Sequence, residues 1–190
     1  MTMGSRPVSH LDDSCRCACR QDLGAYRIGR RGLLLGASAT VLALRPSLVR
    51  AASGDYQAMV LACIDPRLQE PVQKYLAGRG LIGEFSQFTI AGAAIAAVAP
   101  AFASWHETFW DNLAVSIKLH HIKSVIAIDH RDCAAVRIAY GDASIATAEV
   151  ETETHRKAMG EFRNEVGRRQ PTLKVETLLM ALDGSVATFG

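Results

Sequence analysis

The chain has 190 residues, of which 49% are hydrophobic and 21% charged, so it can build a globular core in one domain or at most two small ones. The net charge of +2 is unevenly distributed: residues 1–51 carry 8 Lys and Arg against 3 Asp and Glu, and residues 52–190 carry 13 against 16. The net charges are therefore +5 and −3. Because the larger part has no basic block and no alternation of basic with aromatic residues, we expect no nucleic-acid partner.

Residues 1–51 read as an N-terminal extension with an export signal. Arg30 and Arg31 precede a mostly apolar run at 32–44, and residues 49–51 fit the small-residue rule for signal peptidase. The run is too short to span a bilayer comfortably, so no stable membrane insertion is expected. The arginine pair resembles a twin-arginine (Tat) signal, which predicts a periplasmic or secreted protein. The alternatives are an ordinary secretory signal, or no export, with a basic tail before a buried helix in a cytoplasmic protein.

Five cysteines divide between the two parts of the chain. Cys15, Cys17 and Cys19 lie upstream of the signal and have no fourth metal ligand nearby, so we expect no role for them. Cleavage would leave only Cys63 and Cys133. Two cysteines in an exported protein can form a disulfide, which is one alternative to the metal site described below. Inert buried thiols are the other.

The first half of residues 52–190 alternates strand and helix patterns. An apolar run predicts a buried strand at 56–64. Helical spacing follows to a stop at Gly78 or Gly80, with its apolar positions at Leu68, Val72, Tyr75 and Leu76. Alternation predicts a second strand at 84–92, and the small residues at 93–102 predict a loop or a short helix.

The second half continues the alternation. A helix is predicted at 103–121, where the stripe of Trp105, Phe109, Leu113 and Ile117 indicates core or a dimer interface. A third buried strand follows at 123–129, then a short helix at 133–141. An amphipathic helix at 147–169 has its apolar face at Val150, Met159, Phe162 and Val166. The last segment predicts a strand, a turn at Asp183-Gly184 and a short final strand.

This order of elements predicts an α/β fold with a central, mostly parallel sheet flanked by helices, formed by residues 52–190. Ligands of such sheets bind at the carboxyl ends of the strands. Cys63 and His130 both stand at predicted strand ends, which makes this edge the expected site.

Cys63, His130 and Cys133 together offer two thiolates and an imidazole, the ligand types that zinc takes, and three protein ligands are typical of a catalytic zinc site. The H-x-x-C spacing puts His130 and Cys133 about one helical turn apart, within reach of one ion. Cys63 must be brought near by the sheet. The alternative for His130 is a hydrogen-bonded core histidine.

Asp65 and Arg67 follow Cys63 closely and suggest a second layer of the site. Asp65 is two residues from Cys63 and points to the same side of an extended segment. Arg67 can pair with its carboxylate through two hydrogen bonds, keeping it ionised and oriented toward a reacting water. The alternative is a helix-capping pair after the strand.

The remaining polar residues have structural interpretations. We expect Asp129 and Asp132 to be solvated or capping, and His120 and His121 to end a helix and interact with its dipole. His106 is expected on a helix surface or in packing. His155 is expected on a polar helix face, and it is assigned no role.

The two motifs together resemble the β-class carbonic anhydrases, whose usual pattern is Cys-x-Asp-Ser-Arg followed later by His-x-x-Cys-Gly. Here residues 63–67 read CIDPR and residues 130–134 read HRDCA. The segment FTIAGAAI resembles the family's strand before its Asn-Ala-Gly turn, and residues 109–130 resemble the helix and strand that deliver the histidine. The resemblance covers roughly residues 57–140. The departures are Pro66, Ala134 and the missing Asn.

The resemblance implies a zinc lyase that hydrates carbon dioxide to bicarbonate and a proton, with Cys63, His130 and Cys133 as metal ligands and Asp65 and Arg67 as catalytic residues. It also implies a homodimer or higher homo-oligomer, because the family's active site lies at a dimer interface. Related members hydrolyse carbon disulfide or carbonyl sulfide with the same ligands, and others have lost activity. A non-catalytic zinc-binding module and a disulfide-linked domain without metal therefore remain alternatives.

Overall fold

The structure is a computed structural model and describes residues 54–189. The predicted export signal, with Cys15, Cys17 and Cys19, lies outside the described residues. Across residues 54–189 no helix combines the length and the apolar character needed to cross a membrane.

Five strands form one sheet in the order β2-β1-β3-β4-β5. The first four, β1 (Ala58–Ala62), β2 (Phe85–Thr89), β3 (Ser124–His130) and β4 (Lys174–Met180), run parallel, and β5 (Val186–Thr188) is antiparallel to β4. Every residue of β1 and all but the first residue of β3 are buried, so both faces of these strands are covered, as expected for the centre of a parallel sheet. The expected α/β fold with a mostly parallel sheet is confirmed.

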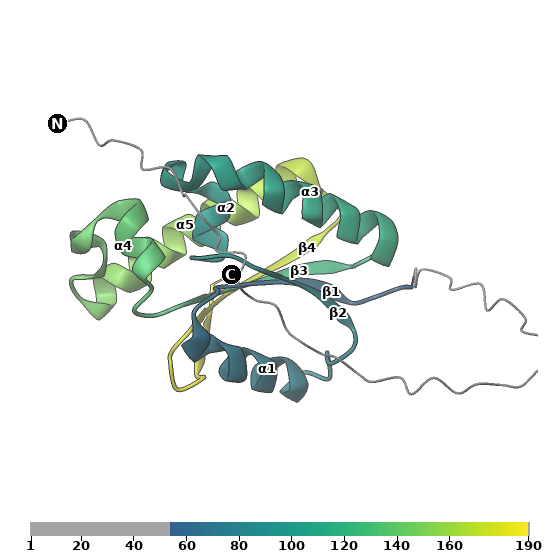
Figure 1. The fold of residues 1–190 in the computed structure, drawn as a ribbon, viewed down its shortest axis with the longest axis horizontal. Coiled ribbons are helices and arrows are strands. Elements are labelled where there is room, and N and C mark those ends of the chain that lie inside the picture. The colour runs from purple at the N-terminus through teal and green to yellow at the C-terminus, as the bar shows by residue number, and fades with distance from the viewer. Residues whose placement is uncertain (1–53, 190) are drawn as a thin grey trace, which may run out of the picture. The chain divides into compact units, whose positions relative to one another are not determined.

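One face of the sheet is covered by α1 (Gln69–Gly78), which lies alone on that side (Figure 1). The core there joins alternate residues of the central strands to Val72 and Leu76 of the helix and to Leu68, the residue just before it. The helix ends where Gly80 adopts φ +69°, a conformation that favours glycine.

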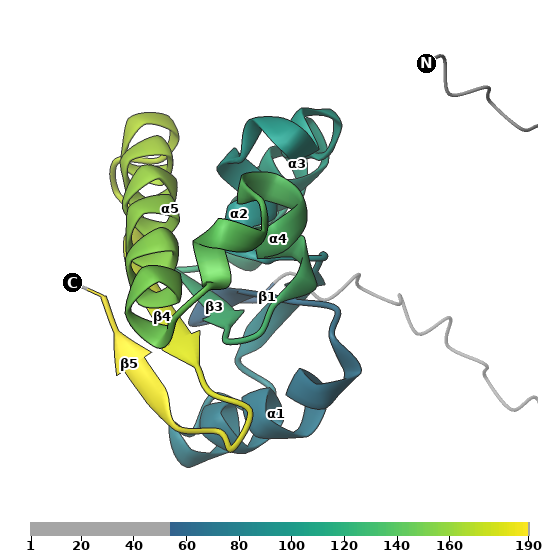
Figure 2. The ribbon, with the colours of Figure 1, turned by 90° about the vertical axis from the view of Figure 1, so that its left-hand side faces the viewer.

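The other face carries α2 (Ala94–Val98), α3 (Ala103–His120), α4 (Ala134–Tyr140) and α5 (Ala148–Arg169) (Figures 1 and 2). Short 3-10 helices stand before α1, α3 and α5 (Pro66–Leu68, Pro100–Phe102 and Asp142–Ile145). The segment predicted as a loop or short helix is thus helical, and its alanines from Ala93 to Ala99 are buried beneath the longer helices. This close packing positions the α2 N-terminus beside the sheet edge.

One detail of the predicted core is wrong. Val150 is 42% exposed, because the buried face of α5 instead runs through Glu151, His155, Met159, Phe162 and Val166. The stripe of α3 was expected to be core or a dimer interface: Phe109 and Leu113 are buried in the core, and Trp105 is 38% exposed. Trp105 begins the stripe near the first turn of α3, where the helix extends beyond the sheet-facing core.

Candidate metal centre

Cys63 and His130 are brought together by two neighbouring parallel strands. The pairing of β1 with β3 aligns Ala62 with Ile128, so that both strands end at the same edge of the sheet. Cys63 is the residue after β1, and His130 is the last residue of β3. A two-residue turn then places Cys133 at the N-cap of α4. The turn works because Asp132 adopts a positive φ of +57°, which Asp tolerates better than most residues.

These three side chains form the one His, Cys, Asp or Glu cluster with metal-ligand geometry in residues 54–189. Their ligand atoms all lie within 4.8 Å of one another, and all three residues are buried. The two thiols are free, so no disulfide joins them in the structure. The sequence-predicted ligand set is therefore assembled as one cluster.

The hydrogen bonds of His130 leave one ring nitrogen available to a metal. Nδ1 lies 2.8 Å from the carbonyl oxygen of Arg131, and since a carbonyl only accepts, Nδ1 carries the hydrogen. Nε2 is fully buried and has no hydrogen-bond partner among the described residues. A buried nitrogen without a partner is costly, and a metal-binding histidine typically donates its other N–H in this way. The cluster thus fits a tetrahedral metal with sulfur and nitrogen ligands.

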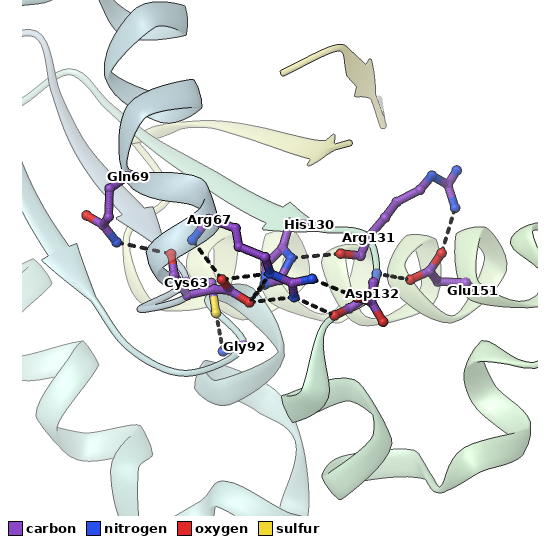
Figure 3. A network of polar contacts seen from close by, with 9 residues as sticks. Cys63, Arg67, Gln69, Gly92, His130, Arg131, Asp132 and Glu151 are labelled. Atoms are coloured by element: carbon purple, nitrogen blue, oxygen red, sulfur yellow. Dashed lines mark hydrogen bonds and ion pairs between the residues drawn. The ribbon is translucent and has the colours of Figure 1, made fainter. Parts of the chain in front are cut away.

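The Cys63 sulfur also accepts a backbone hydrogen bond. Gly92 N–H donates to Cys63 Sγ at 3.3 Å, from the turn that follows β2 (Figure 3). Gly92 has φ +87°, and a Cβ at this position would lie 2.8 Å from Ala135 Cβ. Only glycine fits so close to α4, and sequence analysis did not single it out. The glycine in FTIAGAAI was the signal that could have revealed it.

The cluster favours a thiolate at Cys63. The hydrogen bond with Cys133, helped by His130 and Gly92, lowers the pKa of Cys63 to about 4, although burial acts in the opposite direction. The same contact with Cys63, together with burial, raises the pKa of Cys133 well above its ordinary value. Burial lowers the pKa of His130, but the neighbouring Cys63 outweighs it, and the pKa is raised overall. A metal binds the thiolate forms of the cysteines and the neutral imidazole, so metal binding here would release protons.

Asp65 and Arg67 are paired beside the cluster, and the pair also caps a helix. Asp65 Oδ1 accepts the backbone N–H of Arg67 at 2.9 Å, and Arg67 Nη2 donates to Asp65 Oδ2 at 2.7 Å. These side-chain hydrogen bonds lower the pKa of Asp65 to about 2, so the carboxylate is ionised at neutral pH. Asp65 Oδ2 lies 3.9 Å from His130 Nε2, so the carboxylate faces the cluster.

Arg67 is held from its other side by the turn between His130 and Cys133. Its Nη1 donates to Asp132 Oδ2 at 2.8 Å, and its Nη2 donates to the Asp132 carbonyl oxygen at 3.1 Å. The buried carboxylate of Glu151 holds this turn in place. It accepts hydrogen bonds from the backbone N–H of Asp132 at 2.6 Å and from Nη1 of Arg131 at 3.0 Å (Figure 3). Asp132 was expected to be solvated or capping; it is exposed, but it also orients Arg67.

A cavity of about 270 Å³ opens beside the cluster. Apart from the cluster and Asp65, its lining is apolar and includes the stacked rings of Phe102 and Trp105, whose centroids are 4.6 Å apart. Ile64 and Ile138, which also line it, are strongly exposed. The cavity therefore suits a small apolar molecule.

Two of the residues expected to be unimportant are buried. Asp129 is not solvated: its Oδ1 accepts the Ala94 N–H at the start of α2 at 2.9 Å, so the capping part of the expectation holds. His155 is not on a polar face: it is fully buried, and its Nδ1 lies 3.0 Å from Asp129 Oδ2. The prediction for His155 failed because one carboxylate on β3 makes a polar ring acceptable on the buried face of α5.

The other histidines have the structural places predicted for them. His106 packs with its Nε2 3.1 Å from the Ala99 carbonyl oxygen. His120 ends α3, and His121 follows as its left-handed C-cap with φ +46°. None of the three lies in the cluster.

Comparison with known proteins shows which family the chain belongs to. A family model described as "Putative carbonic anhydrase" matches residues 53–188. The chain belongs to this family. Within it, the buried cluster of Cys63, His130 and Cys133 resembles the zinc site of β-carbonic anhydrases.

Two rickettsial proteins are similar to this carbonic anhydrase family member over 128 residues. Each is 33% identical and spans 67% of this chain; the alignment covers 78% of the Rickettsia bellii protein and 69% of the Rickettsia conorii protein. Both are described as uncharacterised. Among solved structures, the β-carbonic anhydrase CcaA aligns with a TM-score of 0.50 at 11% identity, over 73% of this chain and 80% of that one. At this identity the similarity shows the fold alone.

Proposed function

We propose that this protein is a zinc enzyme that reversibly hydrates carbon dioxide to bicarbonate and a proton. The observation that carries the proposal is the buried cluster of Cys63, His130 and Cys133, with His130 Nε2 left without a partner. Membership of the carbonic anhydrase family supports the same reaction.

The ligand set accounts for the chemistry that a metal would bring. Cys63, His130 and Cys133 would hold zinc through two sulfurs and a nitrogen, leaving a fourth position open, as in catalytic zinc sites. Zinc bound there lowers the pKa of a water molecule to roughly 7 and so supplies hydroxide at neutral pH.

Asp65 is the residue that we propose orients the attacking water. Its carboxylate faces the cluster at 3.9 Å from His130 Nε2 and is kept ionised by Arg67. An ionised carboxylate can only accept hydrogen bonds, so it turns a water hydrogen toward itself and the oxygen lone pair toward the substrate. Arg67, fixed by Asp132, prevents the carboxylate from rotating away.

The cavity supplies the substrate position. Carbon dioxide is small and has no net dipole, so the apolar lining with Phe102 and Trp105 suits it. Apart from Asp65 and the cluster, the lining offers no charged group to retain the bicarbonate product. Release of the anion is therefore favoured.

The test combines metal content with turnover in the full-length chain. Purified without added metal, the wild type should contain about one zinc per chain, and Cys63→Ala should lose it. Stopped-flow hydration of carbon dioxide should then require zinc and should fall at least about 100-fold in Asp65→Ala. Arg67→Ala should lower the rate as well, because it frees the Asp65 carboxylate. Its control is Arg79→Ala, which removes a two-bond pair with a carboxylate, Glu176, away from the cluster. A zinc-free wild type whose thiols are oxidised to each other would overturn the proposal.

A second candidate is hydrolysis of carbonyl sulfide or carbon disulfide at the same site. The apolar lining of the cavity favours it, because these substrates are at least as apolar as carbon dioxide. Parallel rates on the three substrates distinguish the two functions. A zinc-loaded protein without activity on any of them would instead support a non-catalytic zinc-binding role.

We also propose that the protein self-associates. Ile64, Trp105 and Ile138 expose 56%, 38% and 69% of their surface and line the same cavity, and gathered exposed apolar side chains of this kind mark interaction sites. Sedimentation velocity should show a dimer or larger assembly for the wild type. The Ile138→Asp variant should be a monomer, because the new carboxylate would be buried in the interface. A monomeric wild type at micromolar concentration would contradict this.

A further inference from the structure

The turn at residues 90–93, between β2 and α2, has an unusual backbone that needs an external support. Gly92 has φ +87°, and Ala93 follows with φ +46° and ψ −115°, a combination that a residue with a Cβ rarely adopts. Such strain persists only where neighbouring structure holds it. The turn is also the one that donates the Gly92 N–H to the Cys63 sulfur.

The support comes from a buried carboxylate on the next strand. The ψ angle of Ala93 sets the direction of the Ala94 N–H, which donates to Asp129 Oδ1 at 2.9 Å. Asp129 is 1% exposed, so this bond lies out of water and is strengthened by the low polarity around it. The carboxylate therefore fixes the backbone at Ala94, directly after the strained Ala93 and two residues after Gly92.

Asp129 is itself oriented by His155 of α5. His155 Nδ1 lies 3.0 Å from Asp129 Oδ2, and neither side chain reaches solvent. The other ring nitrogen, Nε2, is buried without a hydrogen-bond partner among the described residues. An apolar side chain would avoid that cost, so the contact of Nδ1 with Asp129 is what a histidine adds at this position.

We propose that His155 is a positioning residue for the metal centre: by holding Asp129, it fixes the 90–93 turn so that the Gly92 N–H points at the Cys63 sulfur. The chain of contacts runs from α5 through β3 to the start of α2. Figure 2 shows α5 and α2 on the same face of the sheet. Its consequence for metal binding rests on the proposed zinc site; its consequence for the turn does not. Removing a contact that orients a metal ligand typically lowers metal affinity or activity by about 10- to 100-fold.

The test uses three variants of the full-length chain that differ in which donor remains. His155→Asn keeps an N–H near the position of Nδ1, His155→Gln places its amide near the position of Nε2, and His155→Leu removes both. We expect the Gly92 amide proton of the reduced, metal-free protein to move upfield in the Gln and Leu variants and to stay near wild type in the Asn variant. The zinc Kd should rise about tenfold in Gln and Leu and be restored in Asn.

Several outcomes would overturn the proposal. One is an equal Gly92 shift and zinc Kd in the Asn and Gln variants, since general loss of packing would affect both alike. Another is a set of ring-nitrogen NMR chemical shifts showing that Nδ1 of His155 carries no hydrogen. This measurement is made on the wild type, so it does not depend on whether a variant folds. If the wild type binds no zinc, the proposed function fails, and the Gly92 shift in the metal-free protein still decides the role of His155.

Discussion

Arg67 donates from Nη1 to the Asp132 carboxylate at 2.8 Å although the two residues are 65 positions apart in the chain. The contact joins the turn after β1 to the turn after β3, the two segments that carry the candidate metal ligands. Since Arg67 also pairs with Asp65, its guanidinium links the ligand-bearing turns to the carboxylate that faces the cluster. The orientation of Asp65 thus depends on a residue outside the C-x-D-x-R motif.

Replacing Asp132 by Asn should lower carbon dioxide hydration about tenfold, as is common when a contact that orients a functional group is removed. Asn tolerates the positive φ of this position, so the change removes the charge and leaves the backbone in place. Stopped-flow rates should show a fall in kcat with little change in KM. Asp142→Asn, which removes another exposed carboxylate paired with an arginine, Arg137, is the control. Equal rates in the two variants would mean that Asp132 does not orient Arg67.

The sequence predicted the elements and the ligand cluster because both depend on local patterns. Buried strands leave continuous apolar runs, and the residue types at their ends reveal a shared edge once a parallel sheet is inferred. Cys63, His130 and Cys133 could therefore be assigned to one site without knowledge of strand register. The register of β1 with β3 then brings them together.

The supporting contacts could not be predicted, because they join residues far apart in the chain whose distance in space the sequence does not reveal. Asp132 meets Arg67, and His155 meets Asp129, only through the order of strands and the rotation of α5 about its axis. His155 stands among charged residues in the sequence, and its burial follows from a single partner on β3. Hydrophobic periodicity assigns polar residues to the exposed face of a helix, so it cannot identify a buried histidine such as this one.

Replacing Gly92 by Ala should destabilise the protein more than replacing Gly83 by Ala. Both glycines have nearly the same φ, +87° and +84°, so both alanines meet the same backbone cost of about 1–2 kcal/mol. The added Cβ meets nothing within 4 Å at Gly83 but lies 2.8 Å from Ala135 Cβ at Gly92. We expect a further loss of about 1–3 kcal/mol from this overlap in urea unfolding of the metal-free protein. Equal losses would show that α4 gives way without cost.

Zinc should stabilise the folded protein, and a chelator should remove that stabilisation. At free zinc of 100 times Kd the gain is about 2.7 kcal/mol, because the metal binds the folded chain. Thermal unfolding with zinc and with chelator should therefore give two different Tm values for wild type and a single value for Cys133→Ser. Magnesium is the control, since it prefers oxygen ligands and should not shift Tm. A zinc shift that persists in the variant would place the ion elsewhere.

Glu165 should make stability fall in acid. Arg168 and Arg169 donate to its carboxylate, and the hydrogen bonds from Arg168 first of all lower its pKa from 4.5 to about 2. Because the folded pKa lies below the unfolded one, this contribution is complete above pH 4.5 and is lost as the pH falls toward 2. Its size is at most about 1 kcal/mol, since the pairs are partly exposed and screened by water. Between these pH values, the free energy of unfolding in urea should fall less steeply with acid in Glu165→Gln than in the wild type. In 1 M salt the two slopes should be closer, since the Debye length is then about 3 Å. Identical slopes at low salt would mean that this carboxylate does not sense folding.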